Sequence, residues 1–114
     1  KKMKVDGKDI VAIVNHADTM IKMGNRQKEL AKKLLTYAKK NLPHQDFDLV
    51  NRVREYSIRV DEAVYELKLK LEKKDIGCVE ALDILSLTYE LGELVKKLEN
   101  LCYSLEKLLK SIGR

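Results

Sequence analysis

Apolar residues in the last third of the chain recur at alternating spacings of three and four. They are Ile84, Leu87, Leu91, Leu94, Leu98, Leu101, Leu105, Leu108 and Ile112. Because about 3.6 residues complete a helical turn, this alternation places all of them on one face of a helix. A heptad pattern sustained over this length is typical of coiled-coil-like packing. We therefore predict one long helix over about 78–112.

The middle of the chain carries the same pattern. Its seam comprises Val50, Val53, Ser57, Val60, Val64, Leu67 and Leu71. Pro43 disfavours helical backbone in the residue before it, and Asp46 is a suitable N-cap. Residues 75–77 form a short turn before the last helix. These features predict a second helix over about 46–74.

The first segment has two interpretations. Its seam comprises Ile10, Val14, Ala17, Ile21, Gly24, Lys28, Ala31, Leu35, Ala38 and Leu42. The phase continues through Gly24, which favours a single helix over about 8–42. Gly24 followed by Asn25 is, however, also a typical helix stop and restart. We predict an all-α fold, an elongated antiparallel bundle of three helices in one domain over 1–114. The alternative is a four-helix bundle in which the first segment is split at Gly24.

The bulk properties of the chain agree with a small folded domain. The sequence has 114 residues, of which 45% are apolar and 36% are charged. No apolar run approaches the roughly 20 residues that a membrane-spanning helix needs. The longest run is also too short for the core of a secretion signal, which is about 7–15 residues. We therefore expect a cytoplasmic protein.

Metal and thiol chemistry have little support in the sequence. His16, His44, Cys78 and Cys102 are not spaced as metal ligands, so we expect neither a metal nor a cofactor. If one helix carries both cysteines, they lie about 36 Å apart along it, too far for an internal disulfide. We expect free thiols.

One pair of carboxylates resembles part of a known catalytic motif. Glu90 and Glu93 are spaced as in the first half of the magnesium-binding motif of the MazG-like all-α nucleotide pyrophosphohydrolases. That family places a Glu-x-x-Asp pair on the following helix. Here the corresponding pair, Glu80 and Asp83, precedes Glu90 on the same helix. The order is reversed, so we expect solvated glutamates and no enzyme activity.

Several apolar residues fall outside the predicted seams of the second and third helices. They are Ile58, Tyr65, Leu69, Leu82, Leu85 and Tyr89, with Gly92 beside them. If the two helices run antiparallel through a short turn, these residues form one apolar patch near that turn. Such a patch is typical of a contact surface for another protein or a second copy. In a four-helix bundle it would instead be covered core.

The positive charge of the chain is concentrated in the first segment. Residues 1–42 contain eleven basic and four acidic residues, a net charge of +7, whereas the whole chain carries +5. A basic stripe lies opposite the apolar seam and comprises Lys22, Arg26, Lys32, Lys33, Lys39 and Lys40. It suits phosphates, anionic lipid headgroups or an acidic protein. Nucleic acid is the weaker partner, since base readout prefers Arg and no aromatics interleave for stacking.

Three function hypotheses follow from these surfaces. The first is a non-catalytic protein-interaction module, an adaptor or regulatory bundle that uses the apolar patch. The second is a nucleic-acid or anionic-surface binder that uses the basic stripe. The third is a small accessory protein of the bacteriocin-immunity type, which only the basic, helical composition supports.

Overall fold

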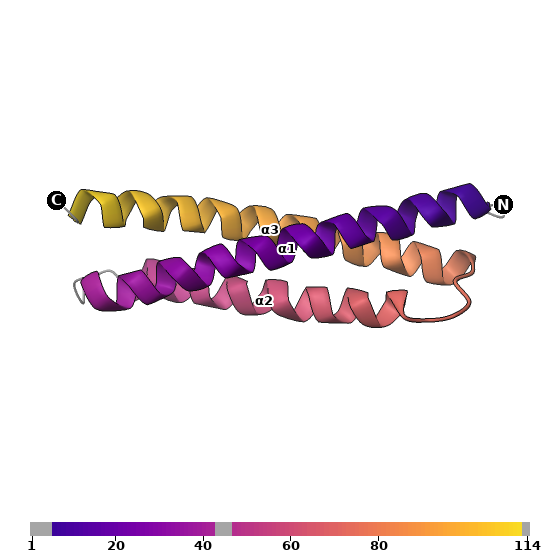
Figure 1. The fold of residues 1–114 in the computed structure, drawn as a ribbon, viewed down its shortest axis with the longest axis horizontal. Coiled ribbons are helices and arrows are strands. Elements are labelled where there is room, and N and C mark those ends of the chain that lie inside the picture. The colour runs from indigo at the N-terminus through magenta and orange to yellow at the C-terminus, as the bar shows by residue number, and fades with distance from the viewer. Residues whose placement is uncertain (1–5, 43–46, 113–114) are drawn as a thin grey trace.

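The chain folds as an all-α three-helix bundle in this computed structural model, which describes residues 6–42 and 47–112. Helix α1 spans Gly7–Asn41, α2 spans Phe47–Leu71 and α3 spans Cys78–Ile112 (Figure 1). All three lie within a few residues of the predicted ranges. The predicted break at Pro43 and N-cap at Asp46 lie outside the described residues.

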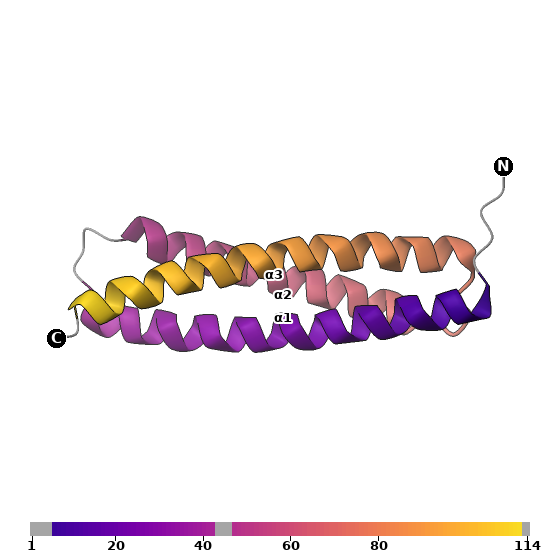
Figure 2. The same cartoon turned by 90° about the horizontal axis from the view of Figure 1, so that it is seen from above.

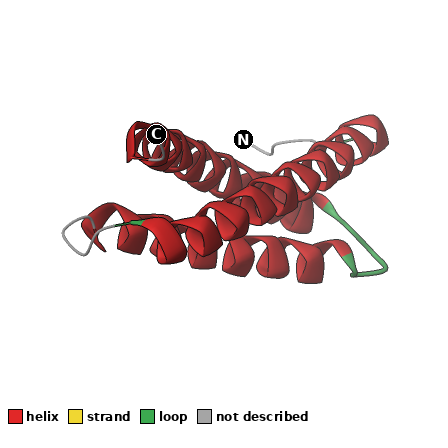
Figure 3. Cartoon of the chain, turned by 60° about the vertical axis from the view of Figure 1, so that its left-hand side comes forward, coloured by secondary structure: helices red, strands yellow, loops and turns green. Residues whose placement is uncertain are grey.

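The three helices form an elongated rod. Its extents are 58 × 25 × 18 Å. Helices α1 and α3 run in the same direction, and α2 runs antiparallel to both (Figures 1 and 2). Figure 1 shows α1 lying diagonally across the other two helices, and the turned view in Figure 3 shows it crossing α3. Each helix therefore contacts both of the others.

The core consists of the predicted seams, but the helices contribute side chains of different size. Helix α2 supplies Val53, Val60 and Leu67, which are completely buried at seven-residue intervals. The fully buried row of α3 comprises Ile84, Leu91, Leu98 and Leu105. The matching buried row of α1 contains only small residues, Ala17, Gly24, Ala31 and Ala38. Large side chains of α2 and α3 thus pack against the nearly bare surface of α1.

Gly24 lies where α1 closely approaches both other helices. A Cβ atom built on it would lie 3.0 Å from Cγ2 of Val64, 3.4 Å from Cγ1 of Val60 and 3.5 Å from Cδ1 of Leu91. Its φ angle is not positive, so the position does not require glycine for backbone conformation. It requires glycine for space. The alternative of a helix break at Gly24 is wrong, because α1 continues through this residue.

The helix ends depend on side-chain caps that periodicity does not reveal. Asp6 caps α1, where its Oδ1 accepts a hydrogen bond of 3.0 Å from the backbone N–H of Asp9. Before α3, the backbone N–H of Gly77 donates to Oε1 of Glu80 at 3.0 Å, as in one half of a capping box. Helix α2 ends at Leu71, three residues earlier than predicted. The half-buried Ile76 packs on the core, so the intervening loop must turn back before residue 74.

The rod shape gives a measurable expectation for the molecule in solution. The Cα radius of gyration is 17.5 Å, whereas a compact domain of this length has about 13 Å. Small-angle X-ray scattering with light scattering should give a particle of about 13.2 kDa with a radius slightly above 17.5 Å, because hydrated side chains add to the Cα value. A radius near that of the compact domain would show that α1 folds back on itself.

Two mid-helix glycines allow a matched test of the packing at Gly24. Glycine costs about 1 kcal/mol relative to alanine inside a helix. At Gly92 an added Cβ meets only the terminal Cε of Met20, at 3.4 Å. We therefore expect Gly92→Ala to raise the free energy of unfolding by about 0.5–1 kcal/mol. Gly24→Ala should unfold at lower urea than Gly92→Ala, because the stiff side chain of Val64 leaves too little room. Equal stabilisation by both substitutions would contradict the close approach of α1.

Candidate protein-interaction surface

One stretch of the groove between α2 and α3 is acidic. It is lined by Arg59, Glu62, Ala63, Glu66, Leu87, Glu90, Glu93 and Leu94. These positions mark the sides of α2 and α3 that face each other next to solvent. None of the residues predicted for the apolar patch lines this groove, so the patch does not bridge α2 and α3 here.

The α2 members of the predicted patch lie on two sides of that helix. Ile58 and Tyr65 are exposed and continue the seven-residue row of Asn51, which lines a depression between α1 and α2. They are therefore on the side of α2 toward α1. Leu69 is also exposed but follows the row of Glu62, at the outer edge of the acidic groove.

The α3 members lie on the side of that helix toward α1. Leu82 and Leu85 are half-buried, and Tyr89 is exposed. Gly92, in the row of Leu85, packs against Met20 of α1. Helix α1 thus lies between the two groups, and the residues predicted as one patch are divided between its two flanks. Heptad positions locate a residue relative to the seam of its own helix, but they do not reveal which neighbour lies on each side.

The contacts between α1 and α3 fix their register. Met20 lies against Gly92, and the side-chain amide of Gln27 hydrogen-bonds to the Cys102 thiol. Burial raises the pKa of this thiol, and the hydrogen bond from Gln27 partly offsets the rise. Further along, Tyr37 shares a depression with Lys110. Helices α1 and α3 therefore contact each other from Met20 to Tyr37.

This register brings a row of exposed apolar residues on α1 beside an exposed tyrosine on α3. Met23, Leu30 and Tyr37 recur every seven residues and are 49%, 47% and 50% exposed. Tyr37 lies beside Lys110, and the same heptad offset in two parallel helices places Leu30 level with Tyr103. Tyr103 is 62% exposed. We call Met23, Leu30, Tyr37 and Tyr103 the α1–α3 face.

Sequence reasoning missed this face, although a signal for it exists. It considered exposed apolar residues only in the second and third helices. The heptad spacing of Met23, Leu30 and Tyr37 on the first helix is readable from the sequence. Their proximity to Tyr103 is not, because it depends on the register between α1 and α3.

The predicted basic stripe is exposed and adjoins the α1–α3 face. All six of its residues are exposed. Lys22 pairs with Asp18 at 3.5 Å and Lys32 pairs with Glu29 at 3.8 Å. Arg26, Lys33 and Lys40 follow Met23, Leu30 and Tyr37, respectively, by three residues. Within residues 6–42 and 47–112 no ion pair neutralises Arg26, Lys33 or Lys40, so the α1 rim of the face is positively charged.

Some of these lysines gather beside the last apolar residue of the row. Lys32, Lys33 and Lys40 line a shallow depression together with Thr36 and Tyr37. On the α3 side, the ammonium of Lys107 lies 5.5 Å from the ring centroid of Tyr103. The aromatic residues of the α1–α3 face are thus each accompanied by lysine.

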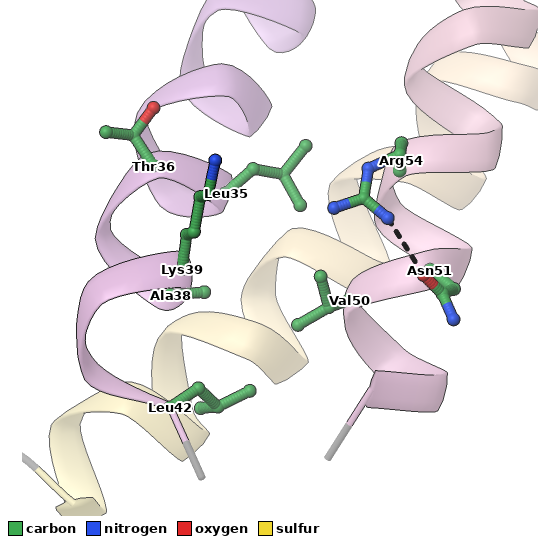
Figure 4. Close-up of a pocket in the computed structure, with 8 residues that line it drawn as sticks. All are labelled: Leu35, Thr36, Ala38, Lys39, Leu42, Val50, Asn51 and Arg54. Carbon is green, nitrogen blue, oxygen red and sulfur yellow. Dashed lines mark hydrogen bonds between the residues drawn. The ribbon is translucent and has the colours of Figure 1, made fainter. Parts of the chain in front are cut away.

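A larger depression lies where α1 ends and α2 begins (Figure 4). It has a volume of about 610 Å³ and is lined by Leu35, Thr36, Ala38, Lys39, Leu42, Val50, Asn51 and Arg54. Arg54 donates a hydrogen bond of 2.8 Å to Oδ1 of Asn51 across its rim. The chain between α1 and α2 lies outside the described residues, so we assign no role to this depression.

The remaining candidate chemistry is sparse in the part of the chain that the structure describes. There, no group of three or more His, Cys, Asp or Glu residues is arranged to hold a metal ion. His16 is exposed, and His44 lies outside the described ranges. In the described part of the chain neither cysteine forms a disulfide, and Cys102 is buried. Among the described helices, none has the length and apolarity needed to cross a membrane.

Fold and surface together define the chain as an elongated three-helix bundle with a basic-rimmed apolar face. No protein-family model matches this chain, and no curated protein or solved structure matches it either.

One polar residue of the α1 seam is held by an ion pair with α2. The ammonium of Lys28 lies 2.5 Å from Oδ1 of Asp61, with 21% of the Lys28 side chain and 60% of the Asp61 side chain exposed. The hydrogen bond from Lys28 is the main cause that lowers the pKa of Asp61 below its ordinary value of 3.8. Lys28 therefore occupies a seam position while its charge reaches the edge of the core.

This ion pair predicts a pH-dependent contribution to stability. A carboxyl whose pKa is lowered in the folded state stabilises it above its unfolded pKa, and this contribution is lost as the pH falls through the folded pKa. Because Asp61 is largely exposed, we expect Asp61→Asn to cost only about 0.5 kcal/mol at neutral pH. The difference from the unsubstituted chain should vanish near pH 2, about two units below the ordinary Asp pKa.

The measurement is urea unfolding at several pH values. Glu62→Gln serves as the control, because Glu62 is a neighbouring exposed carboxylate that has no ion pair within the described residues. The control should show no comparable loss at neutral pH. A cost for Asp61→Asn that stays constant down to the acid end would contradict the assigned interaction.

Proposed function

We propose that this chain is a non-catalytic protein-interaction module that binds another protein through the α1–α3 face. The observation that carries the proposal is the exposed row of Met23, Leu30 and Tyr37 beside Tyr103. Exposed apolar side chains are common singly, but a contiguous apolar face with a polar rim is typical of interaction sites. This face replaces the divided α2–α3 patch as the preferred contact surface.

The rigidity of the bundle favours binding at this face. The side chains project from two helices that are packed along much of their length, so little backbone entropy is lost when a partner docks. Tyr37 and Tyr103 combine a large apolar ring with a hydroxyl. Tyrosines of this kind frequently carry much of the binding free energy at interfaces.

Charge disfavours a symmetric homodimer through the same face. A two-fold contact brings each surface against its own copy. The unpaired Arg26, Lys33 and Lys40 of one chain would then lie close to those of the other, and like charges across an interface are destabilising. A different protein with complementary charge is the better partner.

The nucleic-acid alternative fits this face less well. Glu106 lines the depression beside Tyr37, and Glu99 lies one heptad earlier on α3. With these carboxylates, the α3 side of the face offers phosphates no net positive charge comparable to that of the α1 rim. Met23 and Leu30 also offer no ring on which a base could stack. A protein surface with both apolar side chains and carboxylates can contact the apolar row and pair with the basic α1 rim.

Site-specific photocrosslinking in the source cells tests the proposal. A photoreactive benzophenone amino acid is placed at Leu30 in one variant and at Ile58, an equally exposed apolar position on α2, in a control variant. We expect a discrete covalent adduct with another protein from position 30, identifiable by mass spectrometry, and none of that mass from position 58. The adduct should disappear when Tyr37→Glu is added. Adducts from position 58 alone, or from neither position, would contradict the proposed face.

A further inference from the structure

We infer that the partner segment is an acidic amphipathic helix that lies along the α1–α3 face and completes a four-helix bundle. This inference rests on the proposed function and adds the chemistry of the partner. It is carried by two independent observations, the spacing of the residues that form the face and the sign of the charges on its rim.

The spacing of the exposed residues on α1 forms a second seam beside the buried one. Met23, Gln27, Leu30, Leu34 and Tyr37 alternate by four and three residues. Gln27 and Leu34 are half-buried and form the floor, while the other three side chains stand about half exposed. A row with this alternation matches the period of another helix, whereas an extended strand would contact every second residue.

Helix α3 presents a corresponding row on the other side of the groove. Glu99, Tyr103, Glu106 and Lys110 also alternate by four and three residues. Two adjacent parallel helices that each offer such a row form a groove into which a further helix can pack at 8–10 Å. The apolar part extends from Met23 to Tyr37, about 21 Å at 1.5 Å per residue. A partner helix of about four turns would therefore cover it.

The charges specify the flank of the partner that faces α1. Arg26, Lys33 and Lys40 recur every seven residues along the rim, which is the spacing of flanking charges in paired helices. A partner with Glu or Asp at one flanking heptad position would meet each of them in turn.

The α3 rim is closer to neutral. Glu106 pairs with Lys110 at 3.6 Å, and the charges of Glu99 and of Lys107, which lies over Tyr103, are opposite. Most of the positive charge along the groove therefore lies on its α1 rim. A partner helix with a strongly acidic flank on one side and a mixed flank on the other fits this asymmetry.

Synthetic helical peptides provide a direct probe. The acidic peptide has about three heptads with leucine in the apolar seam, glutamate on the flank that faces α1, alternating glutamate and lysine on the other flank, and one tryptophan. The control peptide replaces each glutamate on the α1-facing flank by lysine. The chain contains no Trp, so the fluorescence of the peptide reports binding without interference. We expect the acidic peptide to bind and to gain helical circular dichroism, and the lysine peptide to bind at least about tenfold more weakly.

Matched protein variants locate the binding. Leu30→Asp should weaken the acidic peptide by about tenfold or more, whereas Ile58→Asp, the same substitution on exposed α2, should leave binding unchanged. The triple variant Arg26→Glu, Lys33→Glu and Lys40→Glu should reverse the preference and favour the lysine peptide. Retained far-ultraviolet circular dichroism in each variant shows that the bundle is intact, since all these positions are exposed.

The possible failures separate the inference from the proposed function. A Leu30 crosslink to a protein together with no binding of the acidic peptide, or equal binding of both peptides, would overturn the acidic helix and keep the interaction module. Absence of both the crosslink and the peptide complex would overturn both. Stronger, Leu30-dependent binding to single-stranded DNA or to phosphatidylserine vesicles than to the acidic peptide would also overturn the inference.

Discussion

The close approach of α1 to α2 and α3 is the constraint on which the rest of the structure depends. It is possible because the buried row of α1 carries almost no side-chain volume, with Gly24 where both other helices approach α1 closely. The branched side chains of Val60, Val64 and Leu91 fill the space that a residue on α1 would otherwise occupy. Dense packing of this kind requires a defined distance between neighbouring helices, since protein interiors tolerate neither voids nor steric overlaps well.

The close packing of α1 also determines which of its residues are exposed on the surface of the rod. With the small residues buried, the next row of α1 stands at the edge of the bundle, and Met23, Leu30 and Tyr37 project beside Tyr103. On the opposite side, one stretch of the groove between α2 and α3 is lined mainly by glutamates, whereas the neighbouring stretch includes Arg59, Lys96 and Lys97. The rod therefore has a basic, apolar side that includes α1 and a carboxylate-rich stretch on the side that excludes it. A charged partner approaching the rod would be oriented by this difference before any apolar contact forms.

The heptad pattern was sufficient to predict the helices because each seam is long and unbroken. The unbroken phase through Gly24 also favoured a single first helix, although the identity of the residue suggested a break. The end of α2 was predicted less well, because it depends on Ile76 packing on the core from within the loop. The contact surface could not be assembled from periodicity, since Tyr65 and Tyr89 occupy equivalent outer positions yet face opposite flanks of α1. Only the arrangement of the three helices distinguishes them.

Gly24 and Lys28, which lie in the α1 seam, explain why α1 packs against its neighbours in one register. A seam that repeats every seven residues could slide by one heptad and still bury apolar side chains. Such a slip would place Ala17 or Ala31 where Gly24 now lies, and a Cβ there would be only 3.0 Å from Val64. It would also remove Lys28 from Asp61 and put Ile21 or Leu35 in its place. The packing at Gly24 and the ion pair at Lys28, one helical turn apart, therefore penalise the same displacement. Because Leu30 and Tyr103 meet only in the selected register, the same two residues also determine the α1–α3 face.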